Sequence, residues 1–494
     1  MKRLILSLAA STALLALNAV AEPVQITVDA GAPLCTNFLG FGVQWSAYPE
    51  FDITDAAWQK VFARLDFMRL PIIRLMLNAR TFCAGFDARG NPIYHWDNNY
   101  MRKMYRLLDY CERRHVAVVL GEWHHAAPGG ESDDPPATLA IKSNTRWHRI
   151  IGDLVEHLCG EKHYTCIAYY NLMNEPNSKK SGYSDFGRWA AALKGMSAEF
   201  SRRGLLDKIK IIGPDATWLP SDGYWLDLAV QQTAADIGAY DFHYYIKPAD
   251  LESGYLEKFC WMKKDYIDRF DERGQSKPFF MGEAGMMSGG AIEPQGGRDS
   301  QLHIYEHIYG VWMADYNIQC ARAGMAGAIA WDLDDAMHTV STKDVDGTDI
   351  HQALFKKWGF FNSLANEIGH PEDANLRPWF FTWSLMARSF PPGCHTLPTS
   401  NVNVAGLRTL AAANGDDFSL ALVNDSDLPQ EIHLAVPGGR KVPQLLRYNY
   451  FPADRLVDSN GFPLPKEILH DADLSSGLNV SLPARSVVIF TSIK

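Results

Sequence analysis

The stretch Cys166-Ile-Ala-Tyr-Tyr-Asn-Leu-Met-Asn-Glu-Pro176 is a short apolar run that ends in a carboxylate, Glu175. A run of this length, closed by a proline, is typical of a buried strand. A second run of the same kind, Pro278-Phe-Phe-Met-Gly-Glu-Ala-Gly285, places Glu283 at its end. We expect each glutamate to stand at the C-terminal tip of its strand, and a parallel barrel keeps its chemistry at those tips.

Around these two stretches, from about residue 37 to 390, short apolar runs alternate with longer amphipathic segments. This alternation is the signature of repeated β-α units. The runs predict eight strands: Leu39–Gln44, Ile72–Leu77, Val116–Trp123, Cys166–Met173, Ile209–Pro214, Ile237–Tyr244, Phe279–Glu283 and Ala326–Trp331. Apolar residues three and four apart predict helices between them: Ala56–Phe67, Met101–Arg114, Trp147–Leu158, Phe186–Arg203, Leu256–Phe270 and Ile304–Ala323.

Eight such units predict an α/β fold, a (β/α)8 TIM barrel over residues 22–392. A doubly wound open sheet is the structural alternative. The first turn lacks the phosphate-binding Gly-x-Gly-x-x-Gly pattern of that fold, and the number of repeats favours closure.

After Pro391-Pro-Gly393 the pattern changes to alternating segments separated by Asn-Gly, Gly-Gly and proline-rich turns. This predicts a smaller C-terminal all-β sandwich over residues 393–494. Its candidate strands are Phe418–Val423, Glu431–Val436, Gln444–Tyr448 and Ser486–Thr491. The strand-like Val24–Val28 can pair with it, so residues 22–33 would then join the sandwich and both chain ends would build it.

The N-terminus indicates export. Lys2 and Arg3 precede an apolar stretch from Leu4 to Leu17 and then Ala19-Val-Ala21, the pattern of a signal peptide over residues 1–21. A membrane anchor is the alternative, but the stretch is shorter than the roughly 20 residues that span a bilayer. We therefore expect a bacterial protein, secreted or periplasmic, with no membrane attachment after cleavage.

Charge and cysteine content exclude some partners. Cleavage removes Lys2 and Arg3 and moves the net charge from −10 to −12, which disfavours nucleic acid and suits a neutral substrate. The eight cysteines form neither a disulfide framework nor a zinc-binding pair of Cys-x-x-Cys motifs. A bridge between Cys159 and Cys166 and a set of buried thiols both stay open.

Polar and aromatic residues gather at the ends of the predicted strands. Side chains two apart on a strand share a face, so His243 and Tyr245 both point toward the barrel mouth. Buried Arg, His and Glu are unfavourable without partners, so such a ring implies mutual pairing or a ligand. The candidates are Arg74, His124, His125, Asn174, Glu175, His243, Tyr245, Glu283, Trp331 and Asp332.

This ordered set resembles clan A of the retaining glycoside hydrolases, most nearly family 5. That family has an Arg at the end of strand two, a His at strand three, Asn-Glu-Pro at strand four, His-x-Tyr at strand six, Glu at strand seven and Trp at strand eight. The matching residues here are Arg74, His125, Asn174-Glu-Pro176, His243-Tyr-Tyr245, Glu283 and Trp331. The chain departs from family 5 in its sandwich, which is more typical of families 30, 39 and 51, and in its second histidine, His124.

The resemblance implies a glycosidase that cleaves β-linkages of a polysaccharide or oligosaccharide, such as a β-glucan or β-mannan, without a cofactor or metal. Glu283 would be the nucleophile and Glu175 the acid/base. Arg74 and Tyr245 would stabilise Glu283, and Asn174 would bind the sugar 2-hydroxyl. His125 and His243 would orient the substrate or tune Glu175. Trp331 would stack on the reacting sugar, and Trp45, Trp123 and Trp218 could line further subsites.

Two other functions are weighed against this one. A metal-dependent barrel hydrolase is suggested by His124, His125 and His243, but adjacent strand residues face opposite ways. A non-catalytic carbohydrate-binding barrel would need a defect that the sequence does not contain.

Four further carboxylates near strand ends could replace a chosen one: Glu122, Asp215, Asp332 and Asp334. The calcium-like segment Lys343–Asp349 lacks a closing Glu. Sugar identity and oligomeric state are not determined by the sequence.

Overall fold

The computed structural model describes residues 22–47, 51–123, 144–178, 185–217, 224–287, 301–337, 355–400, 402–438 and 441–493. Its largest sheet is a closed barrel of eight parallel strands, so the predicted fold is confirmed. In chain order the barrel strands are β2 (Gly40–Gln44), β3 (Ile72–Leu77), β6 (Ala117–Glu122), β7 (Ile167–Asn171), β8 (Lys210–Thr217), β9 (Ala239–Ile246), β10 (Phe279–Met286) and β11 (Gly327–Ala330).

Each barrel strand overlaps the segment predicted for it. The largest differences lie at the carboxyl ends of β8, β9 and β10, which run two or three residues further than expected. Polar residues and glycine there resemble a turn in sequence, yet they continue the ladder, since Met286 still pairs with Ile246. The longer strands carry their side chains further into the mouth of the barrel.

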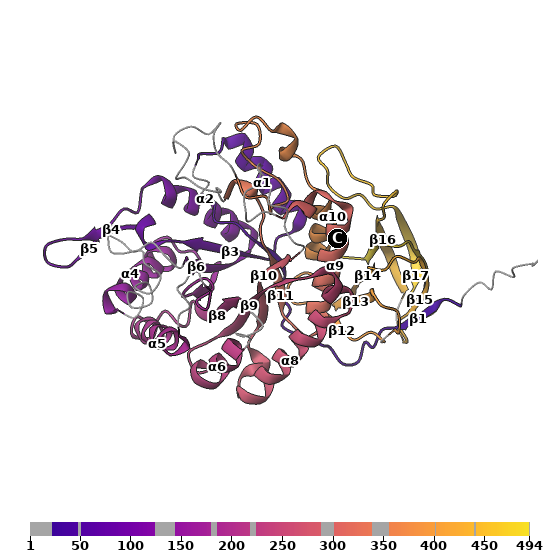
Figure 1. Cartoon of the computed structure of the whole chain (residues 1–494), viewed down its shortest axis with the longest axis horizontal. Coiled ribbons are helices and arrows are strands. Elements are labelled where there is room, and N and C mark those ends of the chain that lie inside the picture. The colour runs from indigo at the N-terminus through magenta and orange to yellow at the C-terminus, as the bar shows by residue number, and fades with distance from the viewer. Residues whose placement is uncertain are drawn as a thin grey trace, which may run out of the picture.

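Helices surround the barrel as Figure 1 shows, with the sandwich beside α9 and α10. The helices are α1 (Asp55–Met68), α2 (Asn99–Arg114), α4 (Thr145–Val155), α5 (Phe186–Arg202), α6 (Tyr224–Thr233), α7 (Pro248–Glu252), α8 (Tyr255–Phe270), α9 (His307–Arg322) and α10 (Pro378–Ser389). Side-chain caps fix several starts, as where Thr54 accepts from the backbone of Ala57. Two predicted helices are irregular: α4 continues as a π-helix over Glu156–Glu161, and the segment before α9 is a 3-10 turn over Leu302–Tyr305.

The second unit is a sandwich of two sheets. The larger contains β12 (His395–Leu397), β13 (Leu407–Asn414), β14 (Asp417–Asn424), β16 (Lys441–Tyr450), β17 (Glu467–Asp473) and β19 (Ser486–Thr491). The smaller contains β1 (Val24–Thr27), β15 (Gln430–Ala435) and β18 (Leu478–Leu482). Because β1 pairs in parallel with β15, the first strand of the chain lies in this sheet and not in the barrel. A separate hairpin joins β4 (Cys83–Phe86) to β5 (Pro92–Tyr94).

Strand alternation places the larger sheet between two hydrophobic cores. On β19, Val488 and Phe490 pack toward the smaller sheet, whereas Val487 and Ile489 belong to the core that is continuous with the barrel. The barrel side of this contact is made by α9 and α10. Because one face of the larger sheet packs on these helices, barrel and sandwich share the first of these cores, while the second lies between the two sheets of the sandwich.

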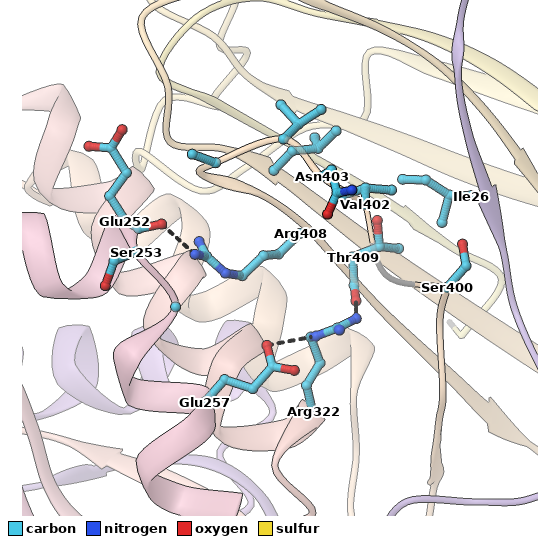
Figure 2. A pocket seen from close by; sticks show the side chains of 14 residues that line it. Ile26, Glu252, Ser253, Glu257, Arg322, Ser400, Val402, Asn403, Arg408 and Thr409 are labelled. Atoms are coloured by element: carbon cyan, nitrogen blue, oxygen red, sulfur yellow. Dashed lines mark hydrogen bonds and ion pairs between the residues drawn. The ribbon is translucent and has the colours of Figure 1, made fainter.

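Arginines connect the barrel to the sandwich at one edge of this contact. Arg408 on β13 donates to Asp315 on α9 at 2.7 Å and to the backbone oxygen of Glu252. Arg322 at the end of α9 donates to the backbone oxygen of Thr409 at 3.1 Å. Figure 2 shows the contacts of Arg408 with Glu252 and of Arg322 with Thr409, beside a cavity of about 280 Å³ between the two units.

The sequence left a disulfide open and predicted a cleaved signal peptide. All eight cysteines lie in the described part of the chain and are free thiols, so the Cys159–Cys166 bridge is not formed. Among the described residues, no helix is long and apolar enough to cross a membrane. The signal segment 1–21 lies outside those residues.

The contact between barrel and sandwich buries two acids whose charge is pH-dependent. Burial and the charge of Asp315 raise the pKa of Asp425 to about 7, although Arg485 donates to it at 2.6 Å. Burial likewise raises the pKa of Asp315 to about 6 against the effect of Arg408. Among the described groups, Asp315 Oδ1 and Asp425 Oδ2 are buried without a hydrogen-bond partner. Burial therefore favours the protonated form of both acids.

We expect the free energy of unfolding to fall as the pH rises from about 5 to about 8. A folded-state pKa raised to about 7 gives stability that is complete below the unfolded pKa and is lost as the pH rises through about 7. Asp425→Asn should reduce this fall, because the amide does not titrate. Urea unfolding midpoints at the two pH values measure the effect.

Asp427→Asn is the matched control, since Asp427 contacts the same Arg485 at 3.0 Å but its side chain is 85% exposed. Its midpoints should keep the wild-type difference between the two pH values. Equal differences in wild type and Asp425→Asn would contradict the linkage.

Candidate active site

The candidate residues meet at the carboxyl ends of the barrel strands. Arg74 lies on β3, His243 and Tyr245 on β9, and Glu283 on β10. Asn174 and Glu175 follow β7 in a turn that is tied to two neighbours: Asn174 N donates to Glu122 O at 2.9 Å, and Glu175 N donates to Asp215 O at 3.0 Å. Strands β7 and β10 are three places apart in the ring, so their glutamates approach from different walls.

Arg74 is the central cation, and its side chain is fully buried. Nη1 donates to Gln44 and, at 2.7 Å, to Glu283 Oε1. Nη2 donates to Asn174 Oδ1 at 2.8 Å and to Asp215 Oδ2 at 2.7 Å. Burial lowers the pKa of Arg74, but the charges of Asp215 and Glu283 outweigh it and raise the pKa above its usual range. The guanidinium therefore stays charged and holds four acceptors in place.

His243 is a second buried cation. Its Nε2 lies 2.9 Å from Asp215 Oδ1, and its Nδ1 lies 3.2 Å from Glu175 Oε1 and 3.5 Å from Glu283 Oε2. Burial lowers the pKa of His243, but Glu283 and Asp215 raise it well above the ordinary value. Because carboxyl oxygens lie beside both nitrogens, the protonated imidazolium, which donates a hydrogen bond from each nitrogen, is the favoured form of the ring.

Asp215 is the anion shared by the two cations. Burial raises its pKa, but Arg74 and His243 outweigh burial and lower the pKa to about 2. Its backbone N–H donates to Asp241 Oδ1 at 2.8 Å. Burial and the charge of Asp215 raise the pKa of Asp241 well above its usual range, which favours its neutral form. Asp215 is thus the permanently ionised acid of the cluster.

The two candidate glutamates differ in burial. The Glu175 side chain is 16% exposed, and its backbone has a φ of 42°, in the left-handed region that side-chain-bearing residues seldom adopt. Asp215 has a similar φ of 55°. Such conformations cost of order 1 kcal/mol or more and persist where the surroundings fix them, often at functional sites. Here the hydrogen bond between these two residues' backbones fixes both.

Glu283 is almost completely buried and accepts from two donors. Tyr245 Oη donates to Oε2 at 2.8 Å, and Arg74 donates to Oε1. Burial, the largest effect, and the charge of Glu175 raise the pKa of Glu283, whereas His243 and Arg74 lower it, and the net shift is upward. The preceding Gly282 leaves room for this packing, because a Cβ there would lie 3.2 Å from the His243 ring.

The distance between the two glutamates is short. One oxygen of Glu175, one of Glu283 and one nitrogen of His243 all lie within 4.8 Å of one another. Two carboxyl groups about 5 Å apart suit a double displacement, whereas inversion needs roughly 6.5–9.5 Å for an intervening water.

Aromatic side chains surround the carboxylates. Trp331 follows β11, is half-buried, and packs edge-on against Trp123 at a centroid distance of 6.2 Å. Trp358 packs edge-on against Tyr245 at 5.5 Å. Trp45, for which the sequence left both a subsite and the core open, is fully buried and packs on Trp58 at 5.2 Å, so it belongs to the core. Its side chain points into the layer between β2 and α1.

The structure thus brings together Arg74, Asn174, Glu175, His243, Tyr245 and Glu283, with Trp331 beside them. His124, His125 and Trp218 lie outside the described residues. Sequence reasoning missed Gln44 and the role of Asp215, which it named only as a rival carboxylate. Two of the other rivals have partners elsewhere: Glu122 accepts from Tyr170, and the Asp334 side chain accepts from Ser363 N. The third, Asp332, is buried with no partner for its Oδ1 among the described groups, and burial raises its pKa well above the usual range. The sequence indicated Asp215 only through its position at the end of the fifth predicted strand.

This fold and site define a glycosidase, and the sequence comparison names the family. The profile described as Cellulase (glycosyl hydrolase family 5) matches residues 35–336. The chain belongs to glycosyl hydrolase family 5, as its strand-end residues had indicated. No curated protein sequence matches the chain.

Solved structures share the whole architecture at low sequence identity. A GH30 endoxylanase from Clostridium papyrosolvens C71 aligns with a TM-score of 0.62 and 12% identity over 95% of this chain and 100% of its own. A GH51 arabinofuranosidase from Xanthomonas axonopodis pv. citri aligns with 0.62 and 13% over 95% and 99%. A glucosidase from Croceicoccus marinus gives 0.61 and 11% over 95% and 98%. These likenesses extend the shared fold from the barrel to the sandwich.

The Tyr245 hydroxyl is a testable element of this site. Tyr245→Phe removes one donor from the ionised form of Glu283, which raises the pKa of that carboxyl. We expect the acid limb of the kcat/KM pH profile on an aryl glycoside to move to higher pH. The maximal value of kcat/KM should fall roughly tenfold or more, because hydrogen bonds to charged groups contribute about 1.5–3 kcal/mol.

Tyr244→Phe is the control, because the neighbouring ring packs outward on Phe259 at 5.8 Å. It should leave the acid limb in place. An acid limb that stays at the wild-type position in Tyr245→Phe would show that this hydroxyl does not tune Glu283.

Proposed function

We propose that the protein is an exported retaining glycosidase that cleaves β-glycosidic bonds by double displacement, with Glu283 as nucleophile and Glu175 as acid/base. The observation that carries this proposal is the approach of the two carboxylates within 4.8 Å, from the fourth and seventh strands of the barrel. This separation leaves room for a sugar carbon between them and too little for an added water.

In the first step Glu283 attacks the anomeric carbon while Glu175 gives its proton to the leaving oxygen. Glu283 is held by Arg74 and Tyr245, which both donate to it and so favour its ionised form. The attack neutralises the Glu283 charge as the glycosyl ester forms. In the second step Glu175, now ionised, takes a proton from water, which attacks the same carbon and releases Glu283.

Charge balance supports this division of roles. Arg74 and His243 are cations, Asp215 is an anion, and the neutral Asp241 adds no charge. One further negative charge makes the cluster neutral, so one of the two glutamates should hold a proton. Glu283 accepts from Arg74 at 2.7 Å and from Tyr245 at 2.8 Å, whereas Glu175 faces one donor, His243 Nδ1, at 3.2 Å. Because donors favour the ionised form, we assign the shared proton to Glu175, as an acid catalyst needs.

Three further residues are assigned to the substrate. Asn174 Oδ1 accepts from Arg74, which turns the amide NH2 group to the other side, where it can donate to the sugar 2-hydroxyl. Trp331 is placed for stacking on the apolar face of the reacting sugar. His125, after strand three, would orient the substrate beside them.

The substrate class follows from charge and composition. A net charge of −10 for the whole chain and a site with balanced charges suit a neutral carbohydrate better than a polyanion. We propose a β-glucan, a β-mannan or a related polysaccharide, met outside the cytoplasm by a bacterial protein whose signal peptide is residues 1–21.

A metal-dependent hydrolase is less consistent with the geometry. Glu175, His243 and Glu283 have the spacing of a metal cluster. However, a His243 imidazolium has no lone pair to offer, and Arg74 places a positive charge 2.7 Å from Glu283. Full activity after exhaustive chelation is the expected result.

Amide variants separate the two glutamates. Glu175→Gln should lose activity on poor leaving groups and regain part of it with an activated aryl leaving group or with azide, because only proton transfer is missing. Glu283→Gln should not recover under either condition. Steady-state rates on a matched pair of aryl glycosides measure both variants.

The anomeric configuration of the first product, followed by NMR, tests the stereochemistry in the wild type. A first product with the configuration of the substrate is expected. Inversion, or equal and modest losses in the two amide variants, would refute the assignment. A wild type that binds oligosaccharides without cleaving them would favour the non-catalytic binding protein instead.

A further inference from the structure

The described segment 355–359, which follows β11 in sequence, contacts the carboxyl ends of β9 and β10. Trp358 lies in it, and its ring packs on Tyr245 of β9. The same ring lies 3.5 Å from the position that a Cβ on Gly285 of β10 would take. A residue from beyond the eighth strand therefore lies over the seventh and the sixth, next to Glu283.

A buried ion pair holds this segment in place. Asp335 Oδ1 accepts from the backbone N–H groups of Trp358 at 2.9 Å and Gly359 at 2.7 Å. Arg377 donates to both oxygens of Asp335 and, at 2.6 Å, to the backbone oxygen of Gly359. Both charged side chains are at most 3% exposed. A Cβ on Gly359 would lie 2.8 Å from the Asp335 backbone nitrogen, so only glycine fits this close approach.

Trp358 combines a firmly held backbone with a side chain that is partly exposed. Its backbone is fixed by a buried carboxylate, yet the residue itself is only half-buried. The Trp331–Trp123 pair joins strand eight to strand three on another part of the rim. Aromatic surface is thus presented at two places, with Glu175 and Glu283 in the same mouth.

We propose that Trp358 is a specificity-determining residue that stacks on a second sugar unit, and that the Asp335–Arg377 pair positions it. The proposal rests on the glycosidase function proposed above. Trp331 serves the reacting sugar, and Trp358 lies against Tyr245 of β9 and Gly285 of β10. The substrate class that fits is an oligosaccharide or polysaccharide, whose neighbouring unit fills the second position, more than a glycoside of one sugar with a small leaving group.

Trp358→Ala tests the proposal on substrates of two sizes. We expect kcat/KM for an oligosaccharide to fall roughly tenfold or more, mostly through KM, because the stacking surface is lost. The β-fluoride of the same sugar has no second unit to stack, so its kcat/KM should change less than about threefold. Trp358→Phe should recover part of the loss on the oligosaccharide.

Trp261→Ala is the control for removing an indole, since Trp261 lies on α8 and is 55% exposed. It should not alter either rate. Arg377→Lys keeps the charge but loses the planar fork that joins Asp335 to Gly359. It should reproduce the selective loss on the oligosaccharide, with a cooperative thermal transition showing that the fold is intact.

Three outcomes would overturn the inference. Equal oligosaccharide rates in wild type and Trp358→Ala, with cleavage intact, would remove Trp358 from the substrate and leave the glycosidase function standing. Equal losses on fluoride and oligosaccharide, with the acid limb shifted as in Tyr245→Phe, would show that Trp358 acts only through Tyr245. A wild type that neither binds nor cleaves oligosaccharides would refute both proposals.

Discussion

The guanidinium of Arg74 is the interaction on which the site depends. A buried cation is strongly unfavourable unless acceptors surround it, and its four acceptors come from β2, β8, β10 and the turn after β7. The barrel must close in the correct register for these groups to meet. The hydrogen bonds that stabilise the Arg74 charge also orient Glu283 and Asn174. Closure of the barrel therefore also assembles the site.

His243 extends this arrangement from a static ion pair to a proton-bearing cluster. Its ring links Asp215, which is ionised, to Glu175, which is partly exposed. Charged groups therefore extend in a row from Asp215 in the interior of the barrel, through His243, to Glu175 at the solvent side. Because the cations are buried behind the glutamates, the substrate side presents carboxyl, amide and aromatic groups, which suit an uncharged sugar.

The barrel and most of the site could be predicted because strand residues obey a simple period. His243 and Tyr245 were placed on one face for that reason, whereas Arg74 and Glu283 were identified by their positions at strand ends and by the family pattern. Asp215 was undervalued because Gly213-Pro-Asp215 resembles a turn, and the φ of 55° that aims its side chain is invisible in sequence. Helix α10 was missed because it is apolar on nearly every side, which removes the period of three and four. The contact of Trp358 with Tyr245 depends on an insertion whose path no local pattern specifies.

The parallel pairing of β1 with β15 has a consequence for biogenesis. The partner of Val24 is Ile432, so the earliest strand to leave the ribosome waits for almost the last part of the chain. During that interval its edge is open to wrong partners, and contacts this distant in sequence form slowly. A chain interrupted before the sandwich would also leave α9 and α10 uncovered. The apolar faces of α9 and α10 that pack on β13, β14 and β19 are therefore buried only after the sandwich strands have been made.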